Sequence, residues 1–298
     1  MSALLAATAV SLAPVMLVIA AGFAWARYGR SFDTATVGPV ASDLAMPCLI
    51  FSALARADMP TSSLAWSALA ALICLLAFAA LGSVILATAG WSLRTYLPSV
   101  TWGNAGFLGI PIALAGFGRD GMLYAVAFSS ISLLFNSVFA QAVVVGRSNL
   151  RAIFATPLIY AVLGGVLVAG FHLVLPSWLL RTVSLIGDMA IPLVLLMIGA
   201  SLARIRPVVF GRALAFSLVR SAGGAMLGLG VGLALGLSAV ARDVLILQCA
   251  MPVAALSYVF AQKWNTDPAE VASLVAVSTW TSALSIPVIL GVIISASG

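Results

Sequence analysis

Apolar segments of about twenty residues follow one another along almost the whole chain, and no other feature limits its fold as strongly. A transmembrane helix needs about 20 predominantly apolar residues to cross the hydrocarbon core of a bilayer. The segments of that length are ten in number: 4–25, 36–55, 64–89, 97–117, 122–145, 154–174, 182–203, 209–237, 242–262 and 270–296. The connections between them are too short for a separate soluble domain. The sequence therefore predicts an all-α polytopic membrane protein with ten transmembrane helices.

The charged residues support a membrane protein and argue against a nucleic-acid partner. Only 7% of the 298 residues are charged, against about 25% in an ordinary soluble domain. The net charge of +6 would suggest nucleic-acid binding in a soluble protein, but here the basic residues lie mainly in connections. The first apolar segment is followed, not preceded, by basic residues and is too long for the core of a signal peptide, so we expect it to be retained as the first span.

The distribution of basic residues predicts the orientation in the membrane. Nine of the fourteen Lys and Arg residues belong to the connections after the first, third, fifth, seventh and ninth spans, and four belong to the others. Cytoplasmic loops carry the excess of Lys and Arg. We therefore expect a multi-pass protein of the cell (inner) membrane with both termini outside the cytoplasm.

Cysteine and histidine give no sign of a metal site or a cofactor. Cys48, Cys74 and Cys249 lie in apolar segments without metal-ligand spacing, and the single histidine, His172, has no neighbouring His or Cys. We interpret the cysteines as small core residues. No metal or cofactor is expected.

Short motifs repeat between the two halves of the chain. The sequence DLAMP at 43–47, in the second span, matches DMAIP at 188–192, in the seventh. A polar spacing in the fifth span recurs in the tenth, as Ser129, Ser132, Asn136 and Ser278, Thr281, Ser285. Because five is an odd number of spans, the second half would lie upside down. We predict a five-plus-five inverted repeat, 1–151 and 152–298, an arrangement typical of secondary transporters.

The stretch NAGFLGIP, from Asn104 to Pro111, predicts a broken helix in the fourth span. Glycine costs about 1 kcal/mol and proline about 3 kcal/mol in a helix interior, and proline also removes a backbone donor. Carbonyl groups freed inside a membrane are tolerated only where they are buried in protein or line a wet cavity. Pro252 predicts a matching break in the ninth span.

If the two broken spans cross in mid-membrane, the N-termini of their half-helices point at the crossing and suit an anion. The candidate substrate-binding residues are Asn104, Ala105, Gly106, Gly109, Pro111, Gln248, Pro252, Val253, Asn136 and Ser285. The alternatives are plain kinked helices packed by small residues, a Gln248 that faces the surface, and polar stripes that only join helices.

Three ionisable residues stand inside apolar spans. Asp43 and Asp188 each lie four residues before a proline, and a carboxylate at that depth is costly unless paired, hydrated or protonated. We interpret them as candidates for ion or proton coupling; alternatively they bind carbonyls freed by the prolines, or form an intramembrane aspartyl protease. Arg220, in the eighth span, either attracts an organic anion or extends towards the cytoplasmic surface.

Three motifs resemble those of the auxin efflux carrier family, which includes bacterial malonate-type transporters and is related to plant PIN proteins. They are MPCLIFSALA at 46–55, GNAGFLGIPIALAGFG at 103–118 and IPLVLLMIGASLAR at 191–204. The resemblance implies ten spans with two crossing broken helices, organic anion substrates and elevator-type alternating access. It places Asn104 and Pro111 in the first crossing helix and Pro252 in the second.

The sequence therefore favours a secondary active transporter, not an enzyme, that moves small carboxylates such as malonate or auxin-like acids. A sodium-coupled transporter like the bile-acid symporters and a channel are the alternatives, with the aspartyl protease less favoured. The expected partners are a small organic anion and the lipid bilayer. The substrate, the direction of transport, coupling to H⁺ or Na⁺, and a homodimer are left open.

Overall fold

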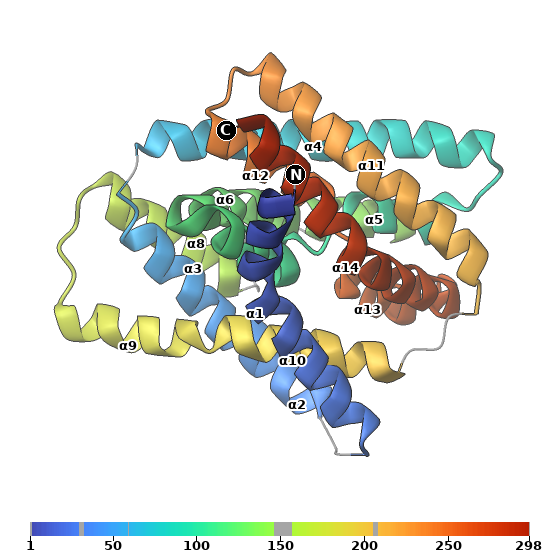
Figure 1. The fold of residues 1–298 in the computed structure, drawn as a ribbon, viewed down its shortest axis with the longest axis horizontal. Helices are drawn as coiled ribbons and strands as arrows, with labels where there is room; N and C mark the ends of the chain where they lie inside the picture. The colour runs from blue at the N-terminus through green and yellow to red at the C-terminus, as the bar shows by residue number, and fades with distance from the viewer. Residues whose placement is uncertain (1, 30–32, 59, 146–156, 205–207, 298) are drawn as a thin grey trace. The chain divides into compact units, whose positions relative to one another are not determined.

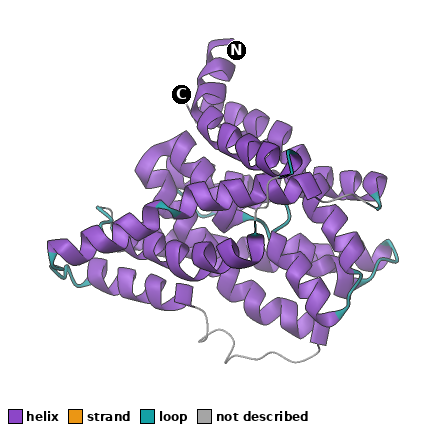
Figure 2. Ribbon diagram, turned by 90° about the horizontal axis from the view of Figure 1, so that it is seen from below, coloured by secondary structure: helices purple, strands orange, loops and turns teal. Residues whose placement is uncertain are grey.

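The computed structural model describes the chain except for residues 1, 30–32, 59, 146–156, 205–207 and 298. Helices and loops make up the described part, without a strand (Figure 2). The elements labelled in Figure 1, with two π-helical turns η1 and η2, are α1 (Ser2–Arg27), α2 (Thr34–Pro39), η1 (Val40–Ala45), α3 (Met46–Ala55), α4 (Thr61–Thr88), α5 (Leu93–Thr101), η2 (Ala105–Gly109), α6 (Ile110–Val145), α8 (Pro157–Gly170), α9 (Ser177–Asp188), α10 (Ala190–Arg204), α11 (Phe210–Ala234), α12 (Ala239–Cys249), α13 (Ala255–Trp264) and α14 (Pro268–Ser297).

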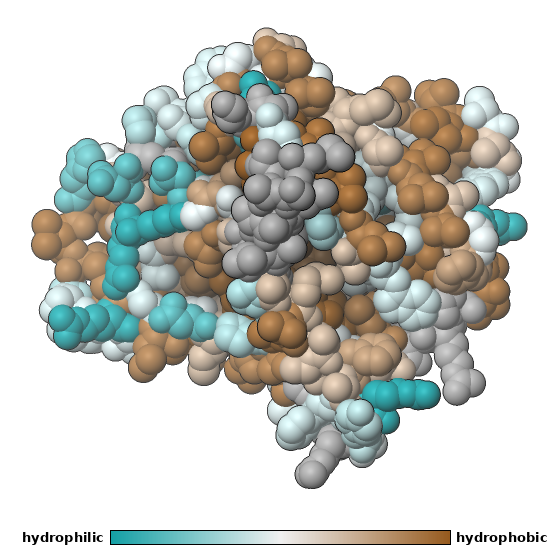
Figure 3. Space-filling model, viewed as in Figure 1, coloured by the Kyte–Doolittle hydropathy of each residue, from teal (hydrophilic) through white to brown (hydrophobic). Residues whose placement is uncertain are grey.

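Six helical segments of the described chain are long and apolar enough to cross a membrane. They are Thr36–Ala55, Ser62–Thr88, Ala105–Val144, Ser177–Ala203, Phe210–Ala234 and Pro268–Ser295. Shorter apolar helices cover Ala13–Arg27 and Pro157–Gly170. Apolar residues are spread over the face drawn in Figure 3, as expected for a surface in contact with lipid. The protein is therefore an all-helical, multi-pass membrane protein.

Helix α6 accounts for part of the difference from the ten predicted segments. It runs through the predicted connection 118–121, but Gly118 has a non-helical backbone (φ 66°, ψ −155°) that bends it there. Glycine adopts a positive φ without steric cost. The sequence placed a connection at this point, and the structure has a bend.

The helices group into two compact units, each of which takes segments from both halves of the chain. Unit 1 contains Met1–Pro14, Ser67–Asn149 and Ile205–Gly298, and unit 2 contains Val15–Trp66 and Leu150–Arg204. The predicted repeats 1–151 and 152–298 therefore both contribute to each unit.

Close contacts at glycine residues hold unit 2 together. A Cβ atom added to Gly199 on α10 would lie 2.0 Å from the carbonyl oxygen of Ile19 on α1, and one on Gly22 would lie 2.2 Å from the carbonyl oxygen of Leu196. A Cβ atom on Gly187 of α9 would lie 2.7 Å from the backbone nitrogen of Leu49 on α3. Small residues let helix backbones approach this closely, which is how membrane helices associate.

Unit 1 is built around α11, which packs against α12 and α14 (Figure 1). A Cβ atom on Gly224 of α11 would lie 2.2 Å from the carbonyl oxygen of Cys249, and one on Gly228 would lie 2.8 Å from the Cα of Ile246. Helices α5, α6 and α13 complete the unit, together with α4 from Ser67 onwards. The two predicted helix breaks both lie in this unit.

Candidate functional site

Two interrupted helices meet inside unit 1. Helix α5 ends at Thr101, residues 102–104 are not helical, and η2 then begins at Ala105. Helix α12 ends at Cys249, residues 251–254 are not helical, and α13 begins at Ala255. Segments about 150 residues apart in sequence thus come together, which no local pattern shows.

The two non-helical segments pair with each other through an antiparallel bridge between Gly103 and Val253. The Asn104 backbone N–H donates to the Pro252 carbonyl at 2.7 Å, and the Ala254 N–H donates to the Trp102 carbonyl at 2.9 Å. Backbone groups that leave a helix inside a membrane need partners within the protein. Each break therefore supplies partners for the other.

The first break begins two residues before the predicted stretch from Asn104 to Pro111, and Pro111 itself lies outside the non-helical segment. The chain leaves the helix at Trp102, whereas Pro111 is the second residue of α6 and is buried. In a first helical turn the N–H that proline lacks would have no helical partner, so proline costs little there. Just before it, the Asn104 carbonyl accepts from Leu108 N–H at 3.2 Å and Gly109 N–H at 3.0 Å. The glycine residues belong to this wide turn.

Gln248 is a buried amide without a hydrogen-bond partner among the described residues. Gln248 lies one helical turn before Pro252. Its side chain packs against Gly109, where a Cβ atom would lie 2.2 Å from the Gln248 Oε1. The residue is 1% exposed, and neither Oε1 nor Nε2 is bonded. The alternative of a surface-facing Gln248 is therefore wrong. Buried amides are nearly always bonded, so an unbonded one suggests a site that a ligand or water occupies.

The remaining candidate residues of the crossing divide into two groups. Ala105, Val253 and Pro252 are buried at the crossing, as is Asn104, which is 6% exposed and makes no capping bond with its side chain. Gly106 is half-buried in η2. The structure therefore brings Asn104, Gly109, Gln248 and Pro252 together.

The polar stripes of α6 and α14 hold the two breaks in place. Thr101, the last residue of α5, donates from Oγ1 to the Asn136 Oδ1 at 2.7 Å, and Asn136 Nδ2 donates to the Ser132 carbonyl at 2.8 Å. On the other side, the Val253 N–H donates to the Ser278 Oγ at 3.1 Å. The Ser285 hydroxyl is buried without a partner among the described residues. Asn136 thus joins two helices, while Ser285 retains a free bonding group.

Arg220 points into the protein and not towards a membrane surface. The residue is 6% exposed. Its Nε donates to the Ser99 carbonyl at 3.2 Å, and its Nη1 donates to the Met251 carbonyl. The guanidinium also lies 5.8 Å from the centre of the Phe78 ring. The alternative in which Arg220 extends towards the cytoplasmic surface is therefore wrong.

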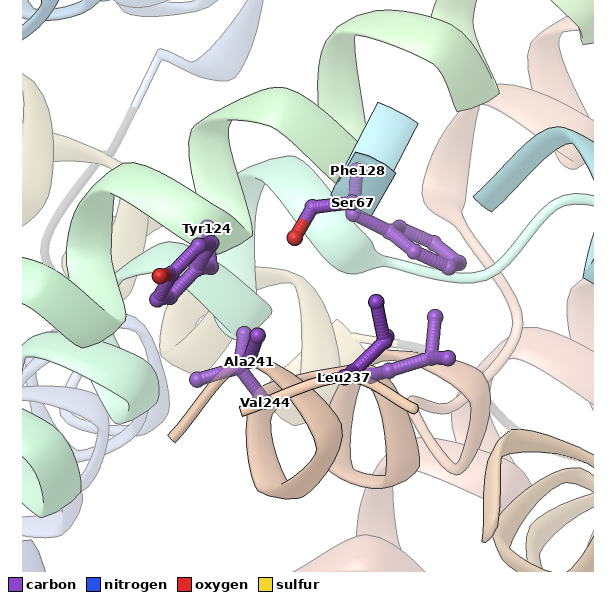
Figure 4. Close-up of a pocket in the computed structure, with 7 residues that line it drawn as sticks. Ser67, Tyr124, Phe128, Leu237, Ala241 and Val244 are labelled. Carbon is purple, nitrogen blue, oxygen red and sulfur yellow. The ribbon is translucent and has the colours of Figure 1, made fainter. Parts of the chain in front are cut away.

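The described part of unit 1 includes a larger and a smaller cavity. The larger, of about 350 Å³, lies between α4, α5 and α11, and its lining is apolar except at Arg220. The smaller, of about 10 Å³, lies between α4, α6 and α12 and has room for about one water molecule. In Figure 4 the Ser67 hydroxyl points into the space above Ala241 and Val244. That hydroxyl has no partner among the described residues.

Asp43 and Asp188 belong to unit 2, whereas the crossing belongs to unit 1. Both side chains are exposed, and the Ser42 hydroxyl donates to Asp43 Oδ1 at 2.7 Å. Within the described part of the chain, no group of three or more His, Cys, Asp or Glu residues could hold a metal ion. Their role in coupling stays a prediction.

Comparisons with known proteins point to transport. A sequence model of the membrane transport protein family matches residues 7–139 and 141–290. An uncharacterized transporter from Methanothermobacter thermautotrophicus is 29% identical over 275 residues, which cover 86% of this chain and 87% of that protein. An uncharacterized transporter from Methanocaldococcus jannaschii is 27% identical over 196 residues, which cover 62% of this chain and 63% of that protein. The family match includes both interrupted helices.

Proposed function

Since the chain belongs to the membrane transport protein family, whose members are auxin efflux carrier-like, we propose that it is a secondary active transporter of small organic anions in the cell membrane. The observation that carries this proposal is the crossing, with its paired breaks and the unbonded amide of Gln248. A broken helix at membrane depth is where many secondary transporters bind substrates or ions.

The proposed topology is ten spans in a five-plus-five inverted repeat. Reciprocal packing supports it, because α1 contacts α10 through Gly22 and Gly199, while α3 contacts α8 through Gly165. In each pair a helix of the first half contacts a helix of the second half. A two-fold axis that relates the two halves requires such reciprocal contacts. Unit 1 has a matching pair, α4 on α5 at Gly82 and α11 on α12 at Gly228. The bend at Gly118 then marks the connection between the fourth and fifth spans.

An anion is the substrate class that the electrostatics of the crossing favour. Two helical segments, η2–α6 and α13, begin at the crossing, and helix N-termini carry a partial positive charge. Gln248 and Ser285 retain hydrogen-bonding groups without partners among the described residues. A small carboxylate would accept hydrogen bonds from the Gln248 Nε2 and from the Ser285 hydroxyl.

For the mechanism, we propose that unit 1 carries the substrate as one body while unit 2 serves as the scaffold. The crossing and its supporting helices belong to unit 1, and the predicted second and seventh spans belong to unit 2. Coupling to H⁺ or Na⁺ through Asp43 and Asp188 is part of this proposal. A sodium-coupled transporter of the bile-acid-symporter type is the alternative, and it would use the same crossing.

A binding screen followed by a transport assay tests the proposal. Purified protein is melted with a panel of mono- and dicarboxylates, and the acid with the largest thermal shift is used for counter-flow in proteoliposomes. Accelerated exchange of labelled substrate is the expected result. A channel would show flux without counter-flow, and the absence of both binding and flux across the panel would reject an organic-anion transporter.

Asn104→Ala is expected to abolish this transport while the protein still inserts and folds. The bonds that Asn104 makes at the crossing come from its backbone, so alanine preserves them and removes only the side-chain amide. Gln262→Ala, which removes an exposed amide of α13, is the matched control. Unchanged transport by Asn104→Ala would count against the proposed site.

A further inference from the structure

The two broken helices leave C-terminal carbonyl groups inside the protein. The last four carbonyls of a helix have no partner within it, and the C-terminus carries a partial negative charge. Thr101 at the end of α5 and Cys249 at the end of α12 are each 1% exposed, so these ends are out of reach of bulk water. Both ends also lie beside the crossing that we propose binds an anion, which a partial negative charge would repel.

One side chain joins the end of α5 to the non-helical segment that follows α12. The guanidinium of Arg220 donates to the Ser99 carbonyl near the end of α5 and to the Met251 carbonyl just after α12. Arginine suits this task because its planar fork carries five N–H donors and a permanent charge. Arg220 therefore connects the first break to the second from a third helix, α11.

Glycine residues make room for this arrangement. Gly224 lies one turn after Arg220 on α11, and a Cβ atom there would lie 2.2 Å from the Cys249 carbonyl oxygen. A Cβ atom on Gly103, at the centre of the bridge, would lie 2.7 Å from Arg220 Nη2. The first glycine lets α11 approach the end of α12, and the second lets the guanidinium approach the crossing.

No carboxylate neutralises Arg220 in the part of the chain that the structure describes. Ion pairs in that part include those of Arg212 with Glu270 and of Arg242 with Asp243, and neither includes Arg220. Among the described residues, the guanidinium of Arg220 contacts two backbone carbonyls and the face of the Phe78 ring. A buried cation without a counter-ion is costly, and such residues inside membranes usually mark functional sites.

We propose that Arg220 is a positioning residue that clamps the C-terminal end of α5 to the non-helical segment after α12 and supplies a fixed positive charge beside the crossing. The clamp stands on the two hydrogen bonds alone. The role of the charge rests on the proposed function, because it assumes that the crossing binds an anion. Separate measurements test the two parts.

Hydrogen–deuterium exchange tests the clamp without any substrate. Arg220→Met is compared with Arg212→Met, a control that removes a guanidinium from the first turn of the same helix, away from the crossing. Exchange in peptides covering 102–109 and 250–257 is expected to be about tenfold faster in Arg220→Met only, as when a hydrogen bond to a charged group is lost. Equal exchange in both variants would overturn the clamp.

If Arg220→Met does not fold, Arg220→Lys serves the same test. Lysine keeps the charge but cannot present the planar fork, so exchange in both peptides should still rise above that of the unmodified protein. Protection equal to the unmodified protein would overturn the two-carbonyl clamp.

Malonate binding tests the charge. Arg220→Met is expected to weaken malonate binding about tenfold, and Arg220→Lys should retain most of the affinity because it retains the charge. Equal loss in both variants would reject the electrostatic part. If the unmodified protein binds neither malonate nor any other carboxylate of the panel, the proposed function fails, and the exchange measurement still decides the clamp.

Discussion

Both units contain a pair of helix interruptions, one from each half of the chain, yet the two pairs have different structures. In unit 2 the helix continues almost at once, because Pro47 is the second residue of α3 and Pro192 is the third residue of α10. In unit 1 the chain is non-helical at 102–104 and 251–254, and the two segments bond to each other. A proline in a first turn leaves a helix intact, whereas Pro252 comes after a helix has ended.

The polar groups follow the same division. At the unit 1 crossing, Gln248 and Arg220 are buried. At the unit 2 bends, Asp43 and Asp188 are exposed, and the close contact is between Gly187 and the backbone of Leu49. Similar sequence signals thus produce one region with buried polar groups and one whose ionisable side chains are exposed. The first supports a binding site and the second supports a scaffold.

Gly187→Ala should have the largest effect, and it tests the packing in unit 2. The added Cβ atom would lie 2.7 Å from the Leu49 nitrogen and 2.8 Å from the Leu49 Cα, and no side-chain rotation can relieve a contact with backbone. Overpacking of this kind costs about 1–3 kcal/mol, so the melting temperature in detergent should fall by about 5 °C. Gly170→Ala, whose Cβ atom would meet nothing within 4 Å, is the control from the same unit. Equal melting temperatures would show that the backbones are not in close contact.

Gln248→Met should have a smaller effect, which raises the stability of the protein and lowers its affinity for malonate. Removing an amide that has no partner should raise the free energy of unfolding by about 1 kcal/mol, while the affinity for malonate falls about tenfold because the amide no longer binds it. Thermal melting with and without malonate measures both quantities. Gln262→Met, which removes an exposed amide bonded to Tyr258, is the control. A less stable protein with unchanged malonate binding would contradict the assignment of Gln248 to the site.

Asp43→Asn and Asp188→Asn should change the packing of the protein least, because neither side chain is buried within it. If these carboxylates take part in coupling, each asparagine variant should change the pH dependence of transport, since asparagine cannot titrate. Counter-flow measured across a pH series checks this, with Asp58→Asn as an exposed control from the same unit. A pH profile identical to that of the unmodified protein in both variants would remove the aspartates from coupling.

Much of the architecture was predictable from the sequence. The scarcity of charge and the length of the apolar segments predicted a helical multi-pass membrane protein. A helix that crosses the hydrocarbon core needs about 20 apolar residues, and the lipid of that core cannot bind polar or charged groups. The motifs around Asn104 and Ile191 predicted the transporter family, and the family comparison confirms it. Pro252 and the glycine-rich stretch before Pro111 marked the regions of both breaks.

Only the tertiary structure decided what the polar residues do. From the sequence Gln248 and Arg220 each had two interpretations, and the structure shows both residues buried, with Arg220 bonded to Ser99 and Met251. It also placed Asp43 and Asp188 in the unit that lacks the crossing. Apolar patterns and proline act within one or two helical turns, so they can be followed along the chain. The partner of a buried polar group lies on a segment more than a hundred residues away, as Ser99 does from Arg220, and only the folded chain brings the two together.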